Sequence, residues 1–219
     1  MAERPDGHSR QVRRRKIQDF TRDHILDAAV TVIERGGLEK ATMDEIAREA
    51  GYGVGTLYNY FESKDDLSVA LFRRYFAAVA DAFRAPPPEG LDGEAALTWS
   101  IAQMLSIAVR ARTLMYEFIH RFHRVGLDGA GLSVDAVHER ARRIDGLIET
   151  VVLRCLRGRR LTCSRRDAAE QLAGFLRGYL GHRLLFGRGS IDPHQDARRI
   201  VRTFLHGVIA SEVSTCRRR

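Results

Sequence analysis

Glu117, His120 and His123 are the residues whose types could bind a metal or transfer protons, because a carboxylate and two imidazoles lie close together in the chain. On a helix, positions i, i+3 and i+6 wrap partly around the surface, so these side chains would not converge on one ion. No nucleophile, base and orienting group can be assigned from spacing, and no glycine-rich phosphate loop occurs. We therefore expect no enzyme activity, no metal and no cofactor. A helical enzyme or a metal sensor is the alternative hypothesis.

Three cysteines, Cys155, Cys163 and Cys216, form the second reactive group. Their odd number and their spacing match neither a disulfide framework nor a paired zinc knuckle. Isolated cysteines are mostly small buried hydrophobic residues. The sequence predicts reduced thiols, with a redox sensor as the alternative.

A denser set of polar side chains lies between Thr42 and Lys64. Thr42 followed by Glu45 is a capping box, which predicts a short helix over residues 43–50. A second short helix is expected over residues 54–60, after a turn that contains glycine. Two short helices joined in this way after a longer one form the helix-turn-helix plan.

The identities of these residues carry more information than their spacing. The segment from Thr42 to Leu67 closely resembles the signature of the TetR family, and Gly55-Thr56-Leu57-Tyr58, Tyr60-Phe61 and Ser63-Lys64 are its most specific parts. The resemblance covers about residues 20 to 72. It implies a sequence-specific DNA-binding transcription regulator, which we expect to be a repressor that a small-molecule effector releases from its operator.

The resemblance also implies which residues meet double-stranded DNA. Asn59 is the best candidate for reading sequence, because asparagine pairs bidentately with adenine in the major groove. Residues 52–54 depart from the family, which has a small aliphatic residue, Ser and often Lys where this chain has Tyr52, Gly53 and Val54, and this removes one hydroxyl contact at Gly53. Packing of the tyrosine rings is the alternative to their contact with phosphate. The positions matching phosphate contacts are Thr42, Tyr58, Tyr60 and Lys64, and those facing base edges are Val54, Gly55, Thr56 and Asn59.

Basic residues are unevenly distributed. The formal net charge is +8, yet residues 1–75 hold thirteen basic and thirteen acidic side chains. Overall charge is therefore weak evidence for nucleic-acid binding, and the local evidence is the acid-free cluster from Arg10 to Lys16. We expect residues 1–19 to form a flexible basic arm that contacts DNA through Arg13, Arg14, Arg15 and Lys16. A solvated tail is the alternative.

Helical periodicity extends over the rest of the chain, and no segment alternates like a strand. Thr21, between Phe20 and Ile25, predicts the start of the first long helix. Ser63 predicts the start of another, Lys64 to Arg84. Further helices are expected at about 94–110, 112–125, 134–157, 165–186 and 194–213. The sequence thus predicts an all-α fold of about nine helices, with a helix-turn-helix domain at 20–85. By the resemblance, residues 86–216 form a ligand-binding and dimerisation domain.

The chain has no run of eighteen apolar residues, and its first thirty residues are polar and basic. We expect a cytoplasmic protein with no membrane partner.

Two apolar stripes near the C-terminus predict a homodimer, in which the helices at about 165–186 and 194–213 form a four-helix interface with their two-fold copies. A core within one chain is the alternative. The residues assigned to this interface are Leu172, Leu176, Leu180, Val201, Phe204, Leu205 and Val208.

Bulky side chains of the later helices are candidates for an effector pocket, although each is also a candidate core residue. All 23 basic residues after residue 75 are arginines, whose forked donors suit carboxylate or phosphate, so we favour an amphipathic anion as effector. Ordinary surface charge is the alternative. The pocket candidates are Trp99, Met104, Tyr116, His120, Phe122, Phe175 and Tyr179, and the nearby arginines are Arg110, Arg112, Arg121, Arg124, Arg177 and Arg183.

Overall fold

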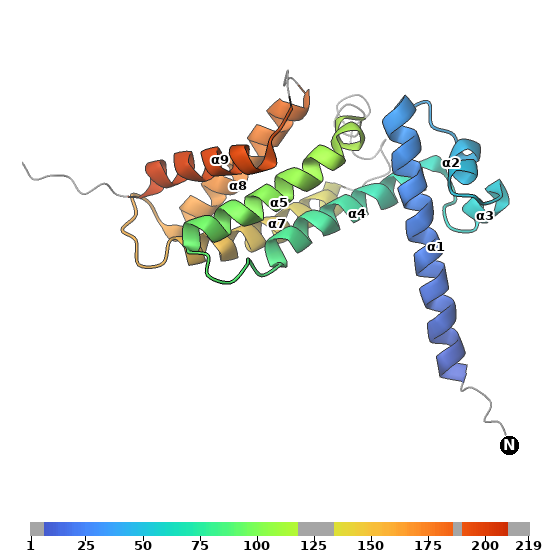
Figure 1. Ribbon diagram of the computed structural model, residues 1–219, viewed down its shortest axis with the longest axis horizontal. Helices are drawn as coiled ribbons and strands as arrows, with labels where there is room; N and C mark the ends of the chain where they lie inside the picture. The colour runs from blue at the N-terminus through green and yellow to red at the C-terminus, as the bar shows by residue number, and fades with distance from the viewer. Residues whose placement is uncertain (1–6, 118–133, 186–189, 210–219) are drawn as a thin grey trace, which may run out of the picture. The chain divides into compact units, whose positions relative to one another are not determined.

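The computed structural model describes residues 7–117, 134–185 and 190–209 of the chain (Figure 1). Within these ranges the regular structure is helical, apart from one isolated antiparallel bridge between Leu161 and Ile209. The predicted all-α fold, with the helix-turn-helix first, is confirmed. In the same ranges, every helix is too short or too polar to cross a bilayer.

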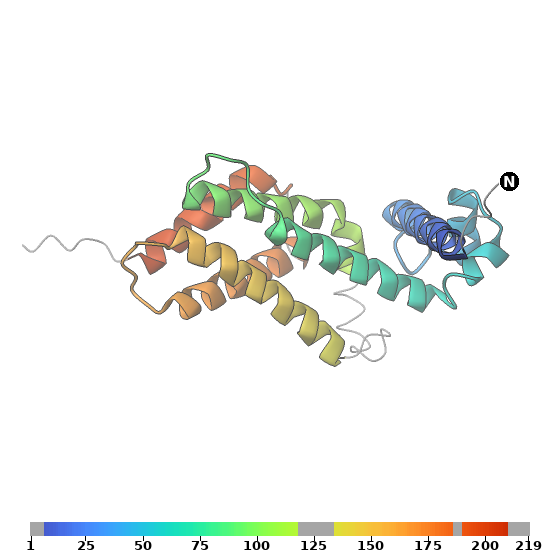
Figure 2. The same ribbon diagram turned by 90° about the horizontal axis from the view of Figure 1, so that it is seen from below.

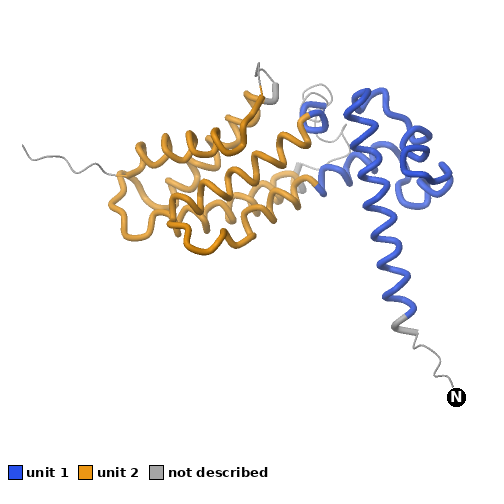
Figure 3. Tube along the Cα trace, in the orientation of Figure 1, with its two compact units in different colours: residues 1–74, 113–132 blue, residues 75–112, 133–219 orange. Residues whose placement is uncertain are grey.

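The chain packs into two compact units, residues 1–74 with 113–132 and residues 75–112 with 133–219 (Figure 3). The division lies inside α4 (Lys64–Arg84), whereas the sequence suggested a boundary at residue 86. The first turns of α4 bury Leu67 and Leu71, and its later turns bury Val79 and Phe83. One continuous helix therefore supplies core residues to both units.

Unit 1 contains α1 (Gly7–Gly36), α2 (Met43–Glu49), α3 (Val54–Tyr58) and the start of α4. α1 packs on α2, and α2 packs on α3. α2 and α3 are too short to be stable alone, so they depend on this packing. The core side chains that are at most 1% exposed include Ile25, Leu26, Ala29, Ile33, Ile46, Leu57 and Phe61.

α1 begins at Gly7, which corrects the expectation of a flexible arm over residues 1–19. Thr21 is a buried residue in the middle of this helix and not its cap. Arg, Gln and Lys are strong helix formers, and no proline interrupts residues 7–20, so the helix continues although it has no apolar stripe to bury. Every residue from Arg10 to Phe20 is exposed, and this part of α1 extends beyond α2 and α3 (Figure 1).

Unit 2 is built from α5 (Gly93–Arg110), α7 (Val134–Cys155), α8 (Arg165–Leu185) and α9 (Pro193–Val208), with the later turns of α4. α5 packs on α7 and α9, and α7 packs on α8 (Figures 1 and 2). Aspartates cap α5 and α9. α9 ends at Val208 and not near residue 213 as expected, because the backbone of Ile209 is extended and bridges to Leu161. The segment 112–117 is helical as well.

The apolar stripes of α8 and α9 face the interior of the chain itself. Five of the seven residues assigned to a dimer interface are at most 5% exposed within the single chain. That assignment is corrected for these five, because a side chain buried in its own protomer cannot meet a second copy. A stripe of apolar residues indicates that a helix face is buried, but it does not indicate whether the same chain or a second copy covers that face. The buried five are Leu172, Leu176, Val201, Leu205 and Val208, whereas Leu180 and Phe204 are half-exposed.

Gly93 sets the separation of α5 and α7, because a Cβ at this residue would lie 2.8 Å from the Cα of Cys155. We predict that Gly93→Ala lowers the free energy of unfolding by about 1–3 kcal/mol, since backbone and not a flexible side chain must shift. Urea denaturation measures this loss.

Gly146→Ala in α7 is the matched control, because its Cβ would meet nothing within 4 Å. It should stabilise the helix by about 0.5–1 kcal/mol. A Gly93→Ala protein as stable as the wild type would contradict the close approach of α5 and α7.

Candidate nucleic-acid interface

The turn between α2 and α3 is held by backbone hydrogen bonds. Gly51 has a φ of +71°, a conformation that costs an L side chain about 1–2 kcal/mol. The N–H groups of Gly51 and Tyr52 donate to the carbonyls of Arg48 and Ala47 at 3.1 and 2.9 Å. These bonds use carbonyls that the end of α2 would otherwise leave without partners. The angle between the two short helices is therefore fixed by main chain.

Thr42 caps the start of α2 as the sequence predicted. Its hydroxyl accepts from the N–H of Glu45 at 3.2 Å, and the Glu45 carboxylate accepts from the N–H of Thr42 at 3.1 Å. The exposed Thr42 hydroxyl also donates to that carboxylate at 3.0 Å. The capping box thus places a hydroxyl and the positive end of the α2 dipole together at the surface.

The polar residues of α3 lie opposite its buried side. Leu57 is fully buried, while Tyr58 is 52% exposed and Asn59, the C-cap, is exposed. Val54, Thr56 and Tyr60 are half-exposed, and Gly53 and Gly55 are exposed. The residues expected to meet DNA are therefore all accessible on unit 1.

Gly53 begins α3 without a side-chain cap, as its lack of a side chain requires. Its carbonyl accepts from the N–H of Thr56 at 2.9 Å. Tyr52 turns to α1, where its ring meets the edge of His24 with centroids 5.9 Å apart. The unusual Tyr52-Gly53 pair thus exchanges a capping hydroxyl for an aromatic contact with α1.

Lys64, the first residue of α4, reaches back across unit 1 to the α1–α2 loop, residues 37–42. Its ammonium donates to the carbonyl oxygens of Leu38, Glu39 and Ala41 at 3.0, 2.9 and 3.0 Å. Sequence reasoning missed these contacts, because they join residues 23 to 26 positions apart and leave no local pattern.

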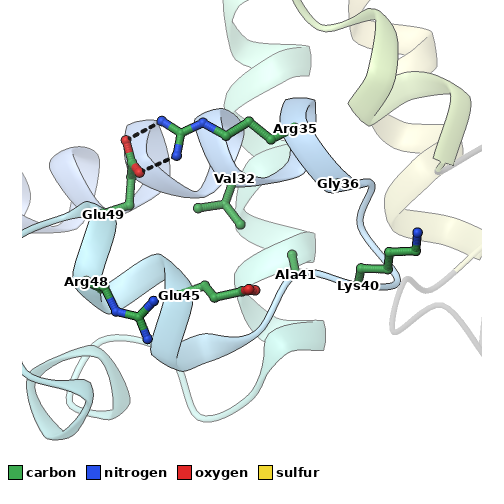
Figure 4. Close-up of a pocket in the computed structure, with 8 residues that line it drawn as sticks. All are labelled: Val32, Arg35, Gly36, Lys40, Ala41, Glu45, Arg48 and Glu49. Atoms are coloured by element: carbon green, nitrogen blue, oxygen red, sulfur yellow. Dashed lines mark hydrogen bonds and ion pairs between the residues drawn. The ribbon is translucent and has the colours of Figure 1, made fainter.

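A cleft of about 440 Å³ lies between the end of α1 and α2 (Figure 4). The guanidinium of Arg35 forms a two-point ion pair with Glu49 at 2.8 and 3.0 Å, which braces the two helices. Glu45 is occupied by the capping box. The acids of this cleft are therefore engaged, and Lys40 and Arg48 are its exposed cations.

The helix-turn-helix of unit 1 matches a known protein family in sequence. Residues 25–71, from the core of α1 into α4, match the family described as bacterial regulatory proteins, tetR family. Residues 25–71 therefore carry the N-terminal domain of the TetR family. The members of this family are regulatory proteins, in agreement with the expectation that this protein is not an enzyme.

Relatives within the TetR family agree over different lengths. The transcriptional repressor KstR of Rhodococcus jostii (strain RHA1) is 39% identical over 70 residues, which are 32% of this chain and 33% of KstR. The matched segments span a quarter to a third of the first two curated relatives, the fatty acid metabolism regulator protein of Bacillus subtilis (strain 168) and KstR.

Solved TetR-family structures resemble the whole fold. A regulator from Mesorhizobium loti MAFF303099 has a TM-score of 0.65 at 19% identity, covering 88% of this chain and 98% of the other. FadR from Bacillus subtilis, solved in complex with stearoyl-CoA, has a TM-score of 0.64 at 18% identity, covering 84% and 97%. At these identities the likeness concerns the fold alone.

The residues expected to line an effector pocket have different settings in the described part of the chain. Met104 is buried, Trp99 is half-exposed, and Tyr116 belongs to unit 1. Phe175 is 46% exposed and stacks on Tyr179 at 6.4 Å on α8. His120 and Phe122 lie outside the described residues, as do Arg121 and Arg124.

The remaining arginines of that prediction have other settings. Arg177 is ion-paired with Asp145, and Arg183 donates to the carbonyl of Ser190 at 2.9 Å. Arg110 and Arg112 are exposed. These placements favour the interpretation of the arginines as surface charge.

The groups of the alternative hypotheses lie partly within the described residues. Glu117 Oε1 lies 2.9 Å from the position that a Cβ on Gly37 would take, while His120, His123 and Cys216 lie outside the described ranges. Burial raises the pKa of Cys155 to about 11, so its thiol stays protonated and unreactive at neutral pH. Among the described residues, no three metal-ligating side chains come together.

Proposed function

We propose that this protein is a sequence-specific DNA-binding transcription regulator, and specifically a repressor that leaves its operator when a small molecule binds. The observation that carries the proposal is the exposed polar face of a helix-turn-helix whose core residues Ile46, Leu57 and Phe61 are buried on the opposite side. Exposed hydroxyls, an amide and helix N-termini are the groups that position and read duplex DNA.

Asn59 is the residue we assign to base recognition. It ends α3 and is exposed beside the half-exposed Thr56. With α3 in the major groove, the Asn59 amide would pair with adenine and the Thr56 methyl would meet a thymine methyl. Thr42, Tyr58 and Tyr60 supply hydroxyls for phosphate oxygens on either side.

The exposed start of α1 supplies the cationic contacts. Arg13, Arg14, Arg15 and Lys16 fall on successive positions of a helix, so they surround it and do not form one stripe. Their mutual repulsion disfavours the free helix, and phosphates would relieve it. We propose that this basic extension lies along the DNA backbone beside the half-site.

A homodimer through α8 and α9 is the assembly we propose, with an interface different from the buried stripes. Phe175, Leu180 and Phe204 stay partly exposed, and a Cβ at Gly174 or Gly178 would meet nothing within 4 Å. Glycines on an open helix face allow a second helix to approach closely. A two-fold dimer then presents two α3 helices to a palindromic site.

The proposed effector is an amphipathic anion. FadR of B. subtilis, a structural relative, binds stearoyl-CoA, which combines phosphates with a long alkyl chain. α4 spans 21 residues, roughly 30 Å, and contributes to both units. A tilt of α4 on effector binding would change the separation of the paired α3 helices, so effector and DNA would oppose each other reciprocally.

Selection from a random DNA pool tests the proposed function. We predict enrichment of an inverted repeat whose half-sites lie about one helical turn apart or a multiple of it. Asn59→Ala should relax the preference at one base pair in each half-site, at a cost of about 1–3 kcal/mol for the preferred base. A pool without an inverted repeat would refute the proposal.

The basic extension is tested by replacing Arg13, Arg14, Arg15 and Lys16 with Gln, which keeps helix propensity. We predict weaker operator binding and a salt slope reduced by about 0.9 for each phosphate that the variant no longer neutralises. The melting temperature should not change, because these side chains are exposed. Fluorescence anisotropy over a salt series measures affinity and slope together.

The matched control removes the same charge from unit 2, by replacing the exposed Arg154, Arg157, Arg160 and Arg165 with Gln. Its salt slope should equal that of the wild type. If the salt slopes of operator binding were equal in the two quadruple variants, the basic extension would not be a DNA contact.

The effector is tested by thermal shift with a long-chain acyl-CoA, free CoA and a cationic amphiphile. We predict that only the acyl-CoA raises the melting temperature and lowers operator affinity, because it alone joins an apolar chain to an anion. Stabilisation by the cationic probe alone would rule out the anion, and a stabilising acyl-CoA that leaves DNA affinity unchanged would rule out the α4 mechanism.

A further inference from the structure

All the hydrogen-bond donors of the Lys64 ammonium are used within the chain, which leaves none for a DNA phosphate. A lysine ammonium carries three N–H donors and no acceptor. In this structure the three donors meet three carbonyl oxygens, all at 2.9 to 3.0 Å. A phosphate oxygen could be reached only by giving up one of these bonds.

The three acceptors belong to the α1–α2 loop, the segment that delivers the chain to the start of α2. Leu38 and Ala41 are each 3% exposed, so their backbone is partly withdrawn from water. Charge-assisted hydrogen bonds to such carbonyls are stronger than neutral ones, and losing the donor leaves the carbonyls poorly solvated. Lys64 therefore holds the loop against the beginning of α4.

Thr42 follows directly after the held carbonyl of Ala41. Its hydroxyl is assigned above to a phosphate, and the position of this hydroxyl and of the α2 N-terminus depends on where the loop ends. Farther along the chain, α2 is held by its buried residues Met43 and Ile46 and by the ion pair of Glu49 with Arg35. The Lys64 ammonium thus fixes the loop before α2 to the start of α4.

We propose that Lys64 is a positioning residue that fixes the α1–α2 loop and the N-terminus of α2 for DNA, and that it does not itself contact phosphate. This inference rests on the proposed DNA-binding function and differs from the role that resemblance to the family assigned to this lysine. The two roles predict different measurements, because a phosphate contact releases counterions and a loop contact does not.

Lys64→Met tests the proposal, since methionine keeps an unbranched side chain and removes the donors. In the free protein we expect the melting temperature to fall by about 2–4 °C and the amide protons of residues 38–42 to exchange faster. For the folded fraction of the variant, operator affinity should fall roughly tenfold, because the displaced α2 N-terminus would lose about one charge-assisted hydrogen bond to phosphate. The salt slope should not change, because Lys64 itself neutralises no phosphate.

Lys40→Met is the matched control, because Lys40 is an exposed lysine of the same loop. It removes the same charge and should change neither the melting temperature nor the exchange of the loop amides. Lys64→Arg is the second variant. It keeps the charge, but its planar guanidinium cannot direct three N–H groups from a single nitrogen to the three carbonyl oxygens, so it should lose stability as Lys64→Met does.

Several outcomes would overturn the proposal. A salt slope lower by about 0.9 in Lys64→Met, with unchanged melting temperature, would make Lys64 a phosphate contact. Wild-type stability and operator affinity in Lys64→Arg would contradict the loop contact. A loss of stability in Lys40→Met equal to that in Lys64→Met would contradict it as well. Destabilisation without loss of affinity per folded molecule would limit Lys64 to stability. The melting and exchange measurements need no DNA, so they test the loop contact even if the proposed function fails.

Discussion

The constraint on which the rest of unit 1 depends is the smallness of its core. α3 has five residues, too few for a helix that is stable in water, so it exists only while Leu57 and the following Phe61 are buried. The guanidinium of Arg22 lies over the Phe61 ring at 4.9 Å and closes this core at α1. Because both apolar residues must face inward, Thr56, Tyr58 and Asn59 have no position left except the surface.

The small core of unit 1 also explains why polar contacts are needed to hold its short helices in place. Arg35 and Glu49 link α1 to α2, Thr42 and Glu45 close the start of α2, and Lys64 links the loop before it to α4. The exposed contacts of Arg35 with Glu49 and of Thr42 with Glu45 add little stability individually. Their value here is geometric, because each fixes one end of a helix that is too short to fix itself. The DNA-binding surface proposed here needs this precision more than it needs stability.

Local signals in the sequence were sufficient for much of unit 1. The capping box at Thr42 and the serine before Lys64 predicted the starts of α2 and α4, because caps and turns act over three or four residues. The start of α1 was predicted wrongly, since the search for an apolar stripe overlooked a helix that propensity alone sustains in an exposed segment.

Tertiary information was what the sequence could not supply. The stripes on α8 and α9 were assigned to a homodimer interface, yet Leu172 and Val201 are buried by their own chain. Hydrophobic periodicity specifies that a face is covered and not which molecule covers it. The three carbonyls around Lys64 were likewise invisible, because a lysine at the start of a helix has the same sequence pattern whether it meets phosphate or main chain.

A structure of the protein bound to its selected inverted repeat tests the central claim most directly, namely that the face opposite Leu57 is the surface that reads DNA. The account predicts α3 in the major groove, Asn59 against a base edge, and the Thr42 hydroxyl at a phosphate. It also predicts that Lys64 keeps its three carbonyl partners in the complex. A complex in which α3 stands outside the groove, with DNA on another face of unit 1, would contradict the account.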